Sequence, residues 1–281
     1  MRSAEARAGS RGGCQPVPSA AAISGAVQHP ETTGEPLLER TFIHCAGVGP
    51  KREQELWAAG LTDWDTLLTG AATGLAGRIK PTIAESRERL AARNHRWFAR
   101  ALPPAEHWRA APAFMECVAF LDIETSGSGE WDQITVLGLS DGSRVRQFVR
   151  NENLRDAVDV IAEAGLIVTF FGTGFDLPFI RREMGIDFPQ LHVDLCFLLR
   201  RLGYRGGLKA IERELGIARS DGTRGMSGLD AVRLWWRWVN WDDEDARSAL
   251  LAYNAEDVAN MAALLDFGVR EMTRRILASS V

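Results

Sequence analysis

Cysteine is scarce in this sequence, and long apolar runs are missing from it. The four cysteines lie far apart, at Cys14, Cys45, Cys117 and Cys196, and none forms a C-x-x-C pair. This spacing argues against a zinc knuckle and a disulfide scaffold, and it fits a reducing compartment. No apolar stretch reaches the roughly 18 residues that cross a bilayer, and residues 1–36 lack the apolar core of a secretory signal. We therefore expect a cytoplasmic protein that has no membrane partner.

Lysine is scarce too, since only Lys51, Lys80 and Lys209 occur among 33 basic residues. Arginine suits bidentate contacts with phosphate, but codon bias in a GC-rich genome would give the same excess. The composition is otherwise ordinary, because 46% of the 281 residues are hydrophobic and 25% are charged. These values are typical of globular proteins and exclude disorder of the whole chain.

Shifts in composition predict four parts of the chain. Residues 1–36 are rich in Ala, Gly, Ser and Pro, and we expect a disordered tail there. A helical pattern covers residues 37–102, a proline-containing linker is expected at 103–113, and a larger domain is expected at 114–281. Residues 37–110 carry 11 basic and 8 acidic side chains, whereas residues 111–281 carry 19 and 26. This imbalance suggests a mildly basic module attached to an acidic one whose carboxylates could hold metal.

The pattern of apolar residues in the larger domain predicts an α/β fold. Short apolar runs predict five strands, at 117–121, 134–139, 145–149, 166–171 and 191–193. Asp141-Gly142 predicts a hairpin turn between the second and third strands. Helices are expected at 154–164, 176–184, 195–202, 207–215, 228–239 and 244–275. Three strands followed by alternating helices and strands imply a mixed five-stranded sheet with helices on both faces.

Carboxylates occur at three places that this fold would bring together. Asp122 and Glu124 end the first strand, and they point to the same face because side chains alternate along a strand. Asp176 follows the fourth strand, where ligands gather in open α/β sheets, although an aspartate there could simply cap a helix. Tyr253 and Asp257 share one face of the last helix. Four carboxylates without clustered His or Cys suit Mg²⁺ or Mn²⁺, and two such ions can promote phosphoryl displacement.

The order D-x-E, F-D and Y-x-x-x-D resembles the DEDD exonucleases of the ribonuclease H-like superfamily, in their DEDDy subtype. The similarity covers residues 114–265, and it is greatest to small prokaryotic exonuclease domains. It implies a ribonuclease H-like fold of α/β/α layers and 3′→5′ hydrolysis of DNA or RNA from a free, single-stranded 3′ end. It also implies that Tyr253 positions the attacking water. The carboxylates that the resemblance assigns to two divalent cations, Mg²⁺ or Mn²⁺, are Asp122, Glu124, Asp176 and Asp257.

One position departs from the family, which usually has Asn-Gly where this chain has Phe171-Gly172. The asparagine is expected near the substrate, so its loss leaves substrate handling open. Two other functions stay open as well. The chain could be a catalytically inactive scaffold that binds nucleic acid, or a structure-specific endonuclease that uses the same metals. A protein that has lost its nuclease activity is not expected to keep all four carboxylates. Their presence here favours a catalytic function. The protein partners of the chain are unknown from its sequence.

A second motif lies in the N-terminal helical part. Gly47-Val48-Gly49 is similar to a helix-hairpin-helix motif, with helices expected at 52–59 and from about Trp64. Glycines let a turn present backbone N–H groups to a phosphate at a helix N-terminus, and Lys51 and Arg52 add positive charge. We interpret Gly47, Gly49, Lys51 and Arg52 as nucleic-acid-binding residues whose contacts do not depend on base sequence. The alternative is a plain helical hairpin that docks on the nuclease or on another protein.

Overall fold

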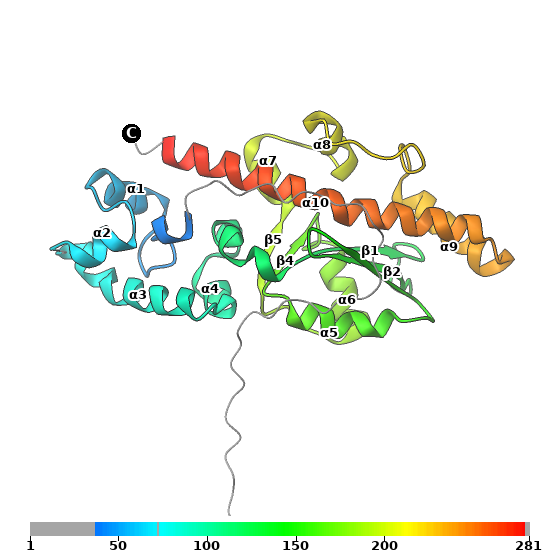
Figure 1. Ribbon diagram of the computed structural model, residues 1–281, viewed down its shortest axis with the longest axis horizontal. Helices are drawn as coiled ribbons and strands as arrows, with labels where there is room; N and C mark the ends of the chain where they lie inside the picture. The colour runs from blue at the N-terminus through cyan, green and yellow to red at the C-terminus, as the bar shows by residue number, and fades with distance from the viewer. Residues whose placement is uncertain (1–36, 72, 279–281) are drawn as a thin grey trace, which may run out of the picture.

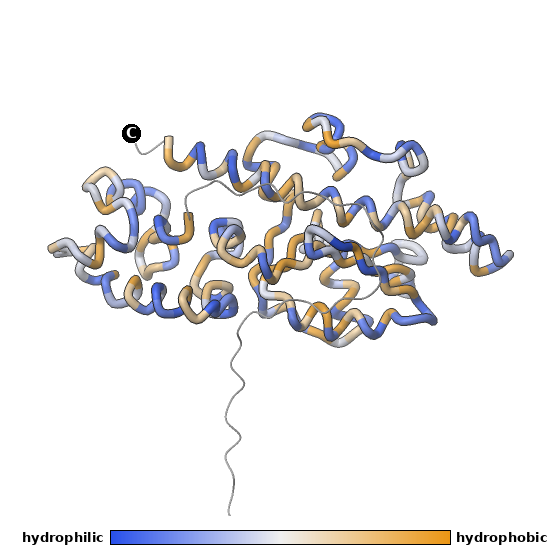
Figure 2. Tube along the Cα trace, in the orientation of Figure 1, coloured by the Kyte–Doolittle hydropathy of each residue, from blue (hydrophilic) through white to orange (hydrophobic). Residues whose placement is uncertain are grey.

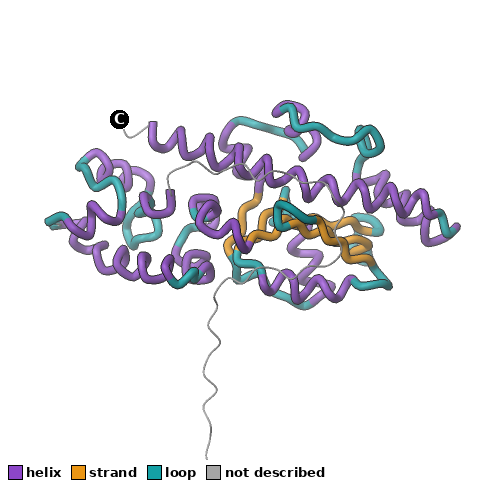
Figure 3. Tube along the Cα trace, in the orientation of Figure 1, coloured by secondary structure: helices purple, strands orange, loops and turns teal. Residues whose placement is uncertain are grey.

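A five-stranded sheet forms the middle of the molecule, and helices cover both of its faces (Figure 1; Figure 3). The computed structural model describes residues 37–71 and 73–278, so the expected tail at 1–36 lies outside the described residues. The helices of the N-terminal part lie together at one end of the sheet. Within the described ranges no helix combines the length and the apolar character needed to cross a membrane.

The sheet is mixed, as the sequence predicts. Its strands are β1 (Val118–Thr125), β2 (Ile134–Ser140), β3 (Val145–Val149), β4 (Leu166–Thr169) and β5 (Leu191–Asp194). They lie in the order β3-β2-β1-β4-β5. The β1–β2 and β2–β3 pairs are antiparallel, whereas the β1–β4 and β4–β5 pairs are parallel. The central strand β1 is therefore flanked on one side by a hairpin and on the other by crossover strands.

The helices of this part also match their predicted positions. They are α5 (Ala157–Glu163), α6 (Asp176–Met184), α7 (Leu195–Leu202), α8 (Leu208–Leu215), α9 (Gly228–Trp241) and α10 (Glu244–Ala278), with a short 3₁₀ turn, η4 (Leu154–Asp156), before α5. Two strand ends differ by more than one residue from their predicted positions. β1 continues to Thr125 beyond the predicted 121, and β4 ends at Thr169 and not at Phe171. The backbone of Phe171 has a φ of 64°, which an extended strand does not allow.

The alternation of β1 explains how the layers form. Ala119, Leu121 and Ile123 pack in the apolar cluster that includes α5 and α6. Val118 and Phe120 belong to the cluster on the opposite face, which includes α7 and α10. Figure 2 shows apolar stretches concentrated along the strands and along the inner sides of the helices. By the same alternation, the next residues on the α10 face are Asp122 and Glu124.

Four α-helices and a 3₁₀ turn are described within residues 37–71 and 73–102. They are η1 (Leu37–Arg40), α1 (Pro50–Ala58), α2 (Trp64–Thr69), α3 (Gly74–Ala91) and α4 (His95–Ala101). Asp63 caps α2, since its carboxylate accepts a hydrogen bond from the Thr66 N–H at 2.8 Å. Buried Trp64 stacks on Phe98, so α2 and α4 share one core.

The segment expected as a linker at 103–113 is packed against both parts. It runs mostly as two 3₁₀ helices, η2 (Pro104–Arg109) and η3 (Ala111–Cys117), and Trp108 is buried. The His192 N–H on the outer strand β5 donates to His107 Nδ1 at 3.1 Å. A single apolar cluster runs from Leu37 through this segment to α10. The division of the chain into domains stays a prediction, but the connection between the parts is rigidly packed.

A buried ion network ties the connecting segment to α1. Arg109, whose side chain is 3% exposed, lies 2.8 Å from Glu53 Oε2 through Nη1 and 2.7 Å from Glu106 Oε2 through Nε. The second oxygen of Glu53 accepts hydrogen bonds from the Phe42 and Ile43 N–H groups. The network therefore also fixes the loop that precedes α1.

His44 in that loop predicts a pH dependence of stability. Its Nε2 lies 2.8 Å from Ser86 Oγ, and burial, with the charge of Arg109, lowers the pKa of His44 to about 4. Because this folded-state pKa is below the ordinary 6.5, the stability contribution is full above pH 6.5 and is lost as the pH falls towards 4. The shift corresponds to about 3 kcal/mol. We expect His44→Gln to lose this part of the pH dependence.

Urea unfolding of wild type and His44→Gln at pH 7 and pH 4.5 measures the effect. The difference between the two unfolding free energies should shrink as the pH falls, because only the wild type must protonate His44. Other groups titrate equally in both proteins and cancel. Parallel stability curves for the two proteins would contradict the prediction.

Candidate functional site

The site begins where β1 extends beyond its neighbour β4. The two strands pair only from Val118 to Phe120, so the end of β1 has no strand on that side. Asp176, the first residue of α6, takes the place of the missing neighbour, since its Oδ1 accepts a hydrogen bond from the Ile123 N–H at 3.0 Å. The alternative interpretation, that the Asp176 side chain caps α6, does not hold, because the N-cap position is Phe175. The early end of β4 therefore opens the sheet beside Asp122.

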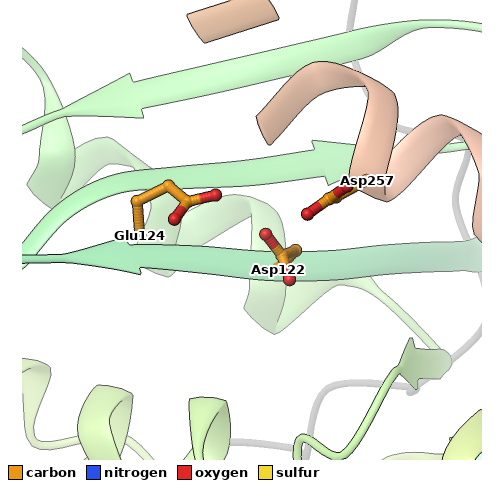
Figure 4. A group of neighbouring side chains, drawn as sticks. All are labelled: Asp122, Glu124 and Asp257. Atoms are coloured by element: carbon orange, nitrogen blue, oxygen red, sulfur yellow. The ribbon is translucent and has the colours of Figure 1, made fainter. Parts of the chain in front are cut away.

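Three carboxylates meet at this opening. Asp122 and Glu124 project from β1, and Asp257 projects from α10 towards them (Figure 4). One carboxylate oxygen from each lies within 4.8 Å of the others. Glu124 and Asp257 are buried, and Asp122 is partly exposed. Oxygen ligands at this spacing can share a hard divalent cation.

All five residues that the sequence singles out in the larger domain line one pocket. The pocket has a volume of about 390 Å³, and its lining includes Asp122, Glu124, Asp176, Tyr253 and Asp257. Its apolar wall comes from other elements: Phe170, Phe171, Phe175, Leu229 and Val232. The structure thus brings the five residues together, and their chemical roles stay predictions.

The carboxylates of the pocket resist ionisation. Burial, followed by the charge of Glu124, raises the pKa of Asp122 well above its usual range. Burial, followed by the charge of Asp257, does the same to the pKa of Glu124. Burial raises the pKa of Asp176 to about 7, although the Ile123 N–H opposes the shift. Like charges this close need a cation or protons, and a perturbed cluster in a pocket is typical of functional sites.

Two cations contact Asp257, and neither was identified as a site residue from the sequence. Lys209 Nζ lies 3.2 Å from Asp257 Oδ2, and Arg219 Nη2 lies 2.6 Å from Asp257 Oδ1. Lys209 also donates a hydrogen bond to the Tyr253 hydroxyl. Burial still raises the pKa of Asp257, with both cations opposing the shift. Lys209 could have been suspected from its Gly207-Leu208-Lys209 context, but no pattern around Arg219 points to the site.

Asn254 is a third residue of the site that the sequence did not reveal. Its Nδ2 donates to Asp122 Oδ2 at 3.1 Å, and its Oδ1 accepts from Gln147 Nε2 at 3.0 Å. It reaches this position because Gly138 on β2 has no side chain, and a Cβ there would collide with the Asn254 amide. A glycine inside an apolar strand was the available signal, since it often marks a close approach of another segment. Asn254 therefore orients the Asp122 carboxylate.

The N-terminal residues expected to bind nucleic acid line no part of this pocket. Gly47 has a φ of +78°, and its carbonyl accepts a hydrogen bond from Arg52 Nη1 at 2.6 Å. Gly49 precedes α1 and is exposed, as is Lys51. The only helix described before Gly47 within residues 37–46 is the four-residue η1. The helix-hairpin-helix interpretation of this segment stays a prediction.

Comparison with known proteins gives the family. The RNase_H superfamily model matches residues 119–267, just over half of the chain. The chain belongs to the RNase_H superfamily. A similar solved structure is the family B DNA polymerase from the hyperthermophilic archaeon Pyrobaculum calidifontis, with 20% identity and a TM-score of 0.44. That match covers 58% of this chain and 25% of the polymerase chain, so this chain spans about a quarter of its length. No curated protein matches the chain.

The family match agrees with the geometry of the site. It includes all three elements that carry the acidic residues: β1, the start of α6 and the central turns of α10. Nucleases with the RNase H-like fold use divalent metal ions, and the triad of Asp122, Glu124 and Asp257 offers suitable ligands. The superfamily is thus shown, while the DEDDy subtype stays a prediction.

Phe171 of this RNase_H superfamily chain stands where the resemblance to the DEDD exonucleases predicts an asparagine. Its side chain is 45% exposed and lines the pocket, and its φ of 64° lies in the left-handed region that bulky residues rarely adopt. Asp194 holds the turn, since its oxygens accept hydrogen bonds from the Phe171 and Thr173 N–H groups. Asparagine tolerates this backbone better than phenylalanine does. The chain therefore keeps an aromatic ring at the pocket despite a local strain.

Proposed function

We propose that the chain is a divalent-metal-dependent nuclease of the DEDDy type that hydrolyses nucleic acid 3′→5′ from single-stranded ends. The observation that carries this proposal is the acidic triad of Asp122, Glu124 and Asp257, which lines a pocket of a RNase_H superfamily chain. Asp176 and Tyr253 line the same pocket and complete the predicted set.

The residues of the pocket fit divalent cations. Carboxylates with raised pKa values lie together there and need positive charge, and their oxygens are the ligands that Mg²⁺ and Mn²⁺ prefer. Asp122, Glu124, Asp176 and Asp257 would hold two such ions. The ions would neutralise the charge of the phosphodiester and favour the attack of water on phosphorus. No side chain of the pocket needs to form a covalent bond to the substrate.

Tyr253 would orient the attacking water. Its oxygen accepts a hydrogen bond from the Lys209 ammonium group, which is a donor only, so its own O–H can donate to a water or to a phosphate oxygen. Burial and the charge of Asp257 raise the pKa of Tyr253, so the hydroxyl keeps its proton. Tyr253 is thus a fixed hydrogen-bond donor at the acidic cluster.

The pocket favours an unpaired strand. Its volume of about 390 Å³ is that of a small-ligand pocket, which suits the end of a single strand. Phe170, Phe171 and Phe175 offer aromatic surface on its wall, and unpaired bases stack on such rings at about 1–3 kcal/mol each. A free end of single-stranded DNA or RNA is therefore the proposed substrate, and the resemblance to the DEDD exonucleases makes it the 3′ end.

A gel assay with 5′-labelled single-stranded DNA and RNA tests this function. Reactions with Mn²⁺, Mg²⁺ or EDTA are compared for the wild type, for Asp122→Asn and for the control Asp159→Asn, an exposed carboxylate on α5. We expect a ladder that shortens from the 3′ end in the wild type and the control only. Discrete internal fragments would instead support an endonuclease. Absence of cleavage with retained binding would support an inactive scaffold.

Tyr253→Phe should lower kcat without weakening metal binding. The substitution removes one hydroxyl that orients water, and misplacement of a reacting group costs about 10²-fold. The carboxylates remain, so the rise in melting temperature with Mn²⁺ should be kept. Tyr204→Phe is a matched control, because Tyr204 packs on Phe267 outside the pocket lining. An unchanged kcat in Tyr253→Phe would remove Tyr253 from the proposed mechanism.

A further inference from the structure

We propose that Phe171, Phe197 and Arg200 form a second binding site for unpaired nucleic acid, beside the carboxylate pocket, and that this site takes the nucleotide next to the terminal one. The inference rests on the nuclease function proposed above, because it assumes that a strand end enters the pocket. It concerns α7, which carries none of the site residues that the sequence predicts.

Two exposed aromatic rings meet beside the carboxylate pocket. The ring centroids of Phe171 and Phe197 are 6.2 Å apart, and the ring planes are inclined by 46°. The two residues are 45% and 42% exposed, and neither belongs to the apolar clusters that form the core of the described residues. Phe171 also lines the carboxylate pocket. The ring pair therefore continues the aromatic wall of the pocket towards solvent.

The carboxylate of Asp194 sets the positions of both rings. Its Oδ1 accepts hydrogen bonds from the Phe171 N–H at 2.9 Å and from the Cys196 N–H at 3.1 Å. The first bond turns the chain after β4, and the second caps α7 just before Phe197. Gly174 completes the arrangement, because a Cβ there would lie 2.6 Å from the Phe171 ring. Both rings are thus in place before a ligand arrives, which lowers the entropy cost of binding.

The backbone at Phe171 indicates that its ring has a role outside the core. The φ of 64° lies in the left-handed region, which asparagine adopts more readily than phenylalanine does. A ring that is nearly half exposed adds little burial in return. Sparsely populated backbone conformations cluster at binding and active sites.

Arg200 supplies the charge that a nucleotide would need beside the rings. Its guanidinium carbon lies 5.4 Å from the centre of the Phe197 ring. Arg200 is exposed and takes part in none of the described ion pairs, whereas the next residue, Arg201, pairs with Glu106 at 3.0 Å. An unpaired base can stack on the rings while its phosphate contacts the guanidinium. Neither contact distinguishes DNA from RNA.

The connecting segment borders this second site. Phe197 lines another pocket, of about 280 Å³, together with Trp108 and Arg201. Trp108 lies outside residues 119–267, which the family model matches. A strand that leaves the carboxylate pocket over the two rings would therefore run towards a part of the chain that the family domain does not include.

Binding of single-stranded DNA and RNA, measured by fluorescence anisotropy in Mn²⁺, tests the second site. The strands carry phosphorothioate linkages to slow cleavage, and one abasic residue is moved along them. The proteins are the wild type, Phe197→Leu, Arg200→Gln, and Phe171→Asn, which suits the left-handed backbone. Trp241→Leu and Arg274→Gln are the matched controls, because both residues are 72% exposed and lie on other helices. Melting curves verify that each variant is folded.

We expect an abasic residue next to the terminal nucleotide to weaken binding to the wild type by about 5- to 150-fold. Phe197→Leu and Phe171→Asn should weaken binding of the intact strand, and the same abasic residue should then cost little more, because one stacking contact cannot be lost twice. Arg200→Gln should reduce the slope of log K against log salt concentration by about 0.7. In cleavage assays Phe197→Leu should raise KM more than it lowers kcat. The controls should match the wild type.

Additive losses from the abasic residue and Phe197→Leu, or no loss from either, would overturn the second site. The same result with metal-dependent cleavage retained would leave the nuclease proposal intact. Non-additive losses in a wild type that never cleaves would support the second site and overturn the nuclease proposal. Failure of the wild type to bind either strand would overturn both.

Discussion

Asp122→Asn is expected to abolish metal-dependent cleavage and, in EDTA, to raise the melting temperature. The substitution removes a cation ligand, and a loss of ~4 kcal/mol of transition-state stabilisation slows the reaction about 10³-fold. Without metal, burial raises the pKa of Asp122 first, and the charges of the neighbouring Glu124, Asp257 and Asp176 raise it further. Removing the Asp122 carboxylate relieves repulsion, and a gain of about 1 kcal/mol would raise the melting temperature by ~2–4 °C.

The difference in stability between Asp122→Asn and the wild type in EDTA should depend on pH. Groups whose pKa is raised by folding stabilise the native state fully below their ordinary pKa, and this contribution is lost as the pH rises through the folded-state value. The raised pKa values of Asp122 and Glu124, and that of Asp176 at about 7, place this loss between about pH 4 and pH 7 or above. The advantage of Asp122→Asn in EDTA should therefore grow from pH 4 to pH 8.

Calorimetric melting in EDTA and in Mn²⁺ over this pH range measures both effects. In Mn²⁺ the order should reverse, because a ligand that binds only the native state raises the melting temperature of the wild type. The control Asp159→Asn should follow the wild type in both conditions. Equal melting temperatures in EDTA, or cleavage retained by Asp122→Asn, would contradict the prediction.

Arg109→Met is expected to be the most destabilising single change in the N-terminal part. Arg109 is the buried counter-ion of Glu53 and Glu106, and its removal leaves two carboxylates without it. Breaking a buried pair by removing one partner costs about 3–5 kcal/mol. Arg201 also contacts Glu106, but Glu53 has no other basic partner in the described ion pairs. The loss should appear in the free energy of unfolding by urea.

Arg270→Met provides the comparison for that experiment. Arg270 pairs with Asp266 on α10, but its side chain is 63% exposed, and such pairs contribute about 0–1 kcal/mol. The double variant Arg109→Met with Glu53→Gln should recover part of the loss, since Glu53 then carries no charge. Similar losses for Arg109→Met and Arg270→Met would show that the network contributes little.

The elements of the α/β part could be predicted because their signals are local. Apolar runs, the Asp141-Gly142 turn and helical periodicity each lie within a few residues, and the strands and helices occur where these signals place them. The end of β4 could not be predicted in this way. Its sequence stays apolar through Phe171, but Asp194, which is 23 residues away, holds the Phe171 N–H and turns the chain. The packing of the segment at 103–113 could not be predicted either, because its prolines suit a linker and 3₁₀ turns alike.

The acidic side of the site could be predicted, and its cationic side could not. Asp122, Glu124 and Asp257 form ordered motifs at the ends or faces of regular elements. Lys209 meets Asp257 from 48 residues away, and Arg219 comes from an irregular connection between α8 and α9. Arginine is abundant throughout the chain, so no single arginine stands out in the sequence.

The packing of the connecting segment fixes more than stability. Arg109 joins the segment to Glu53 in α1, and His107 joins it to β5, so the loop of Gly47 and Gly49 cannot swing relative to the pocket. If the loop binds phosphates as the sequence predicts, one strand that reaches both places spans a constant number of nucleotides. The fixed distance between the loop and the pocket then sets the length of strand that the protein binds. Digestion slows once the strand is too short to contact both the loop and the pocket. The final products then share one minimum length.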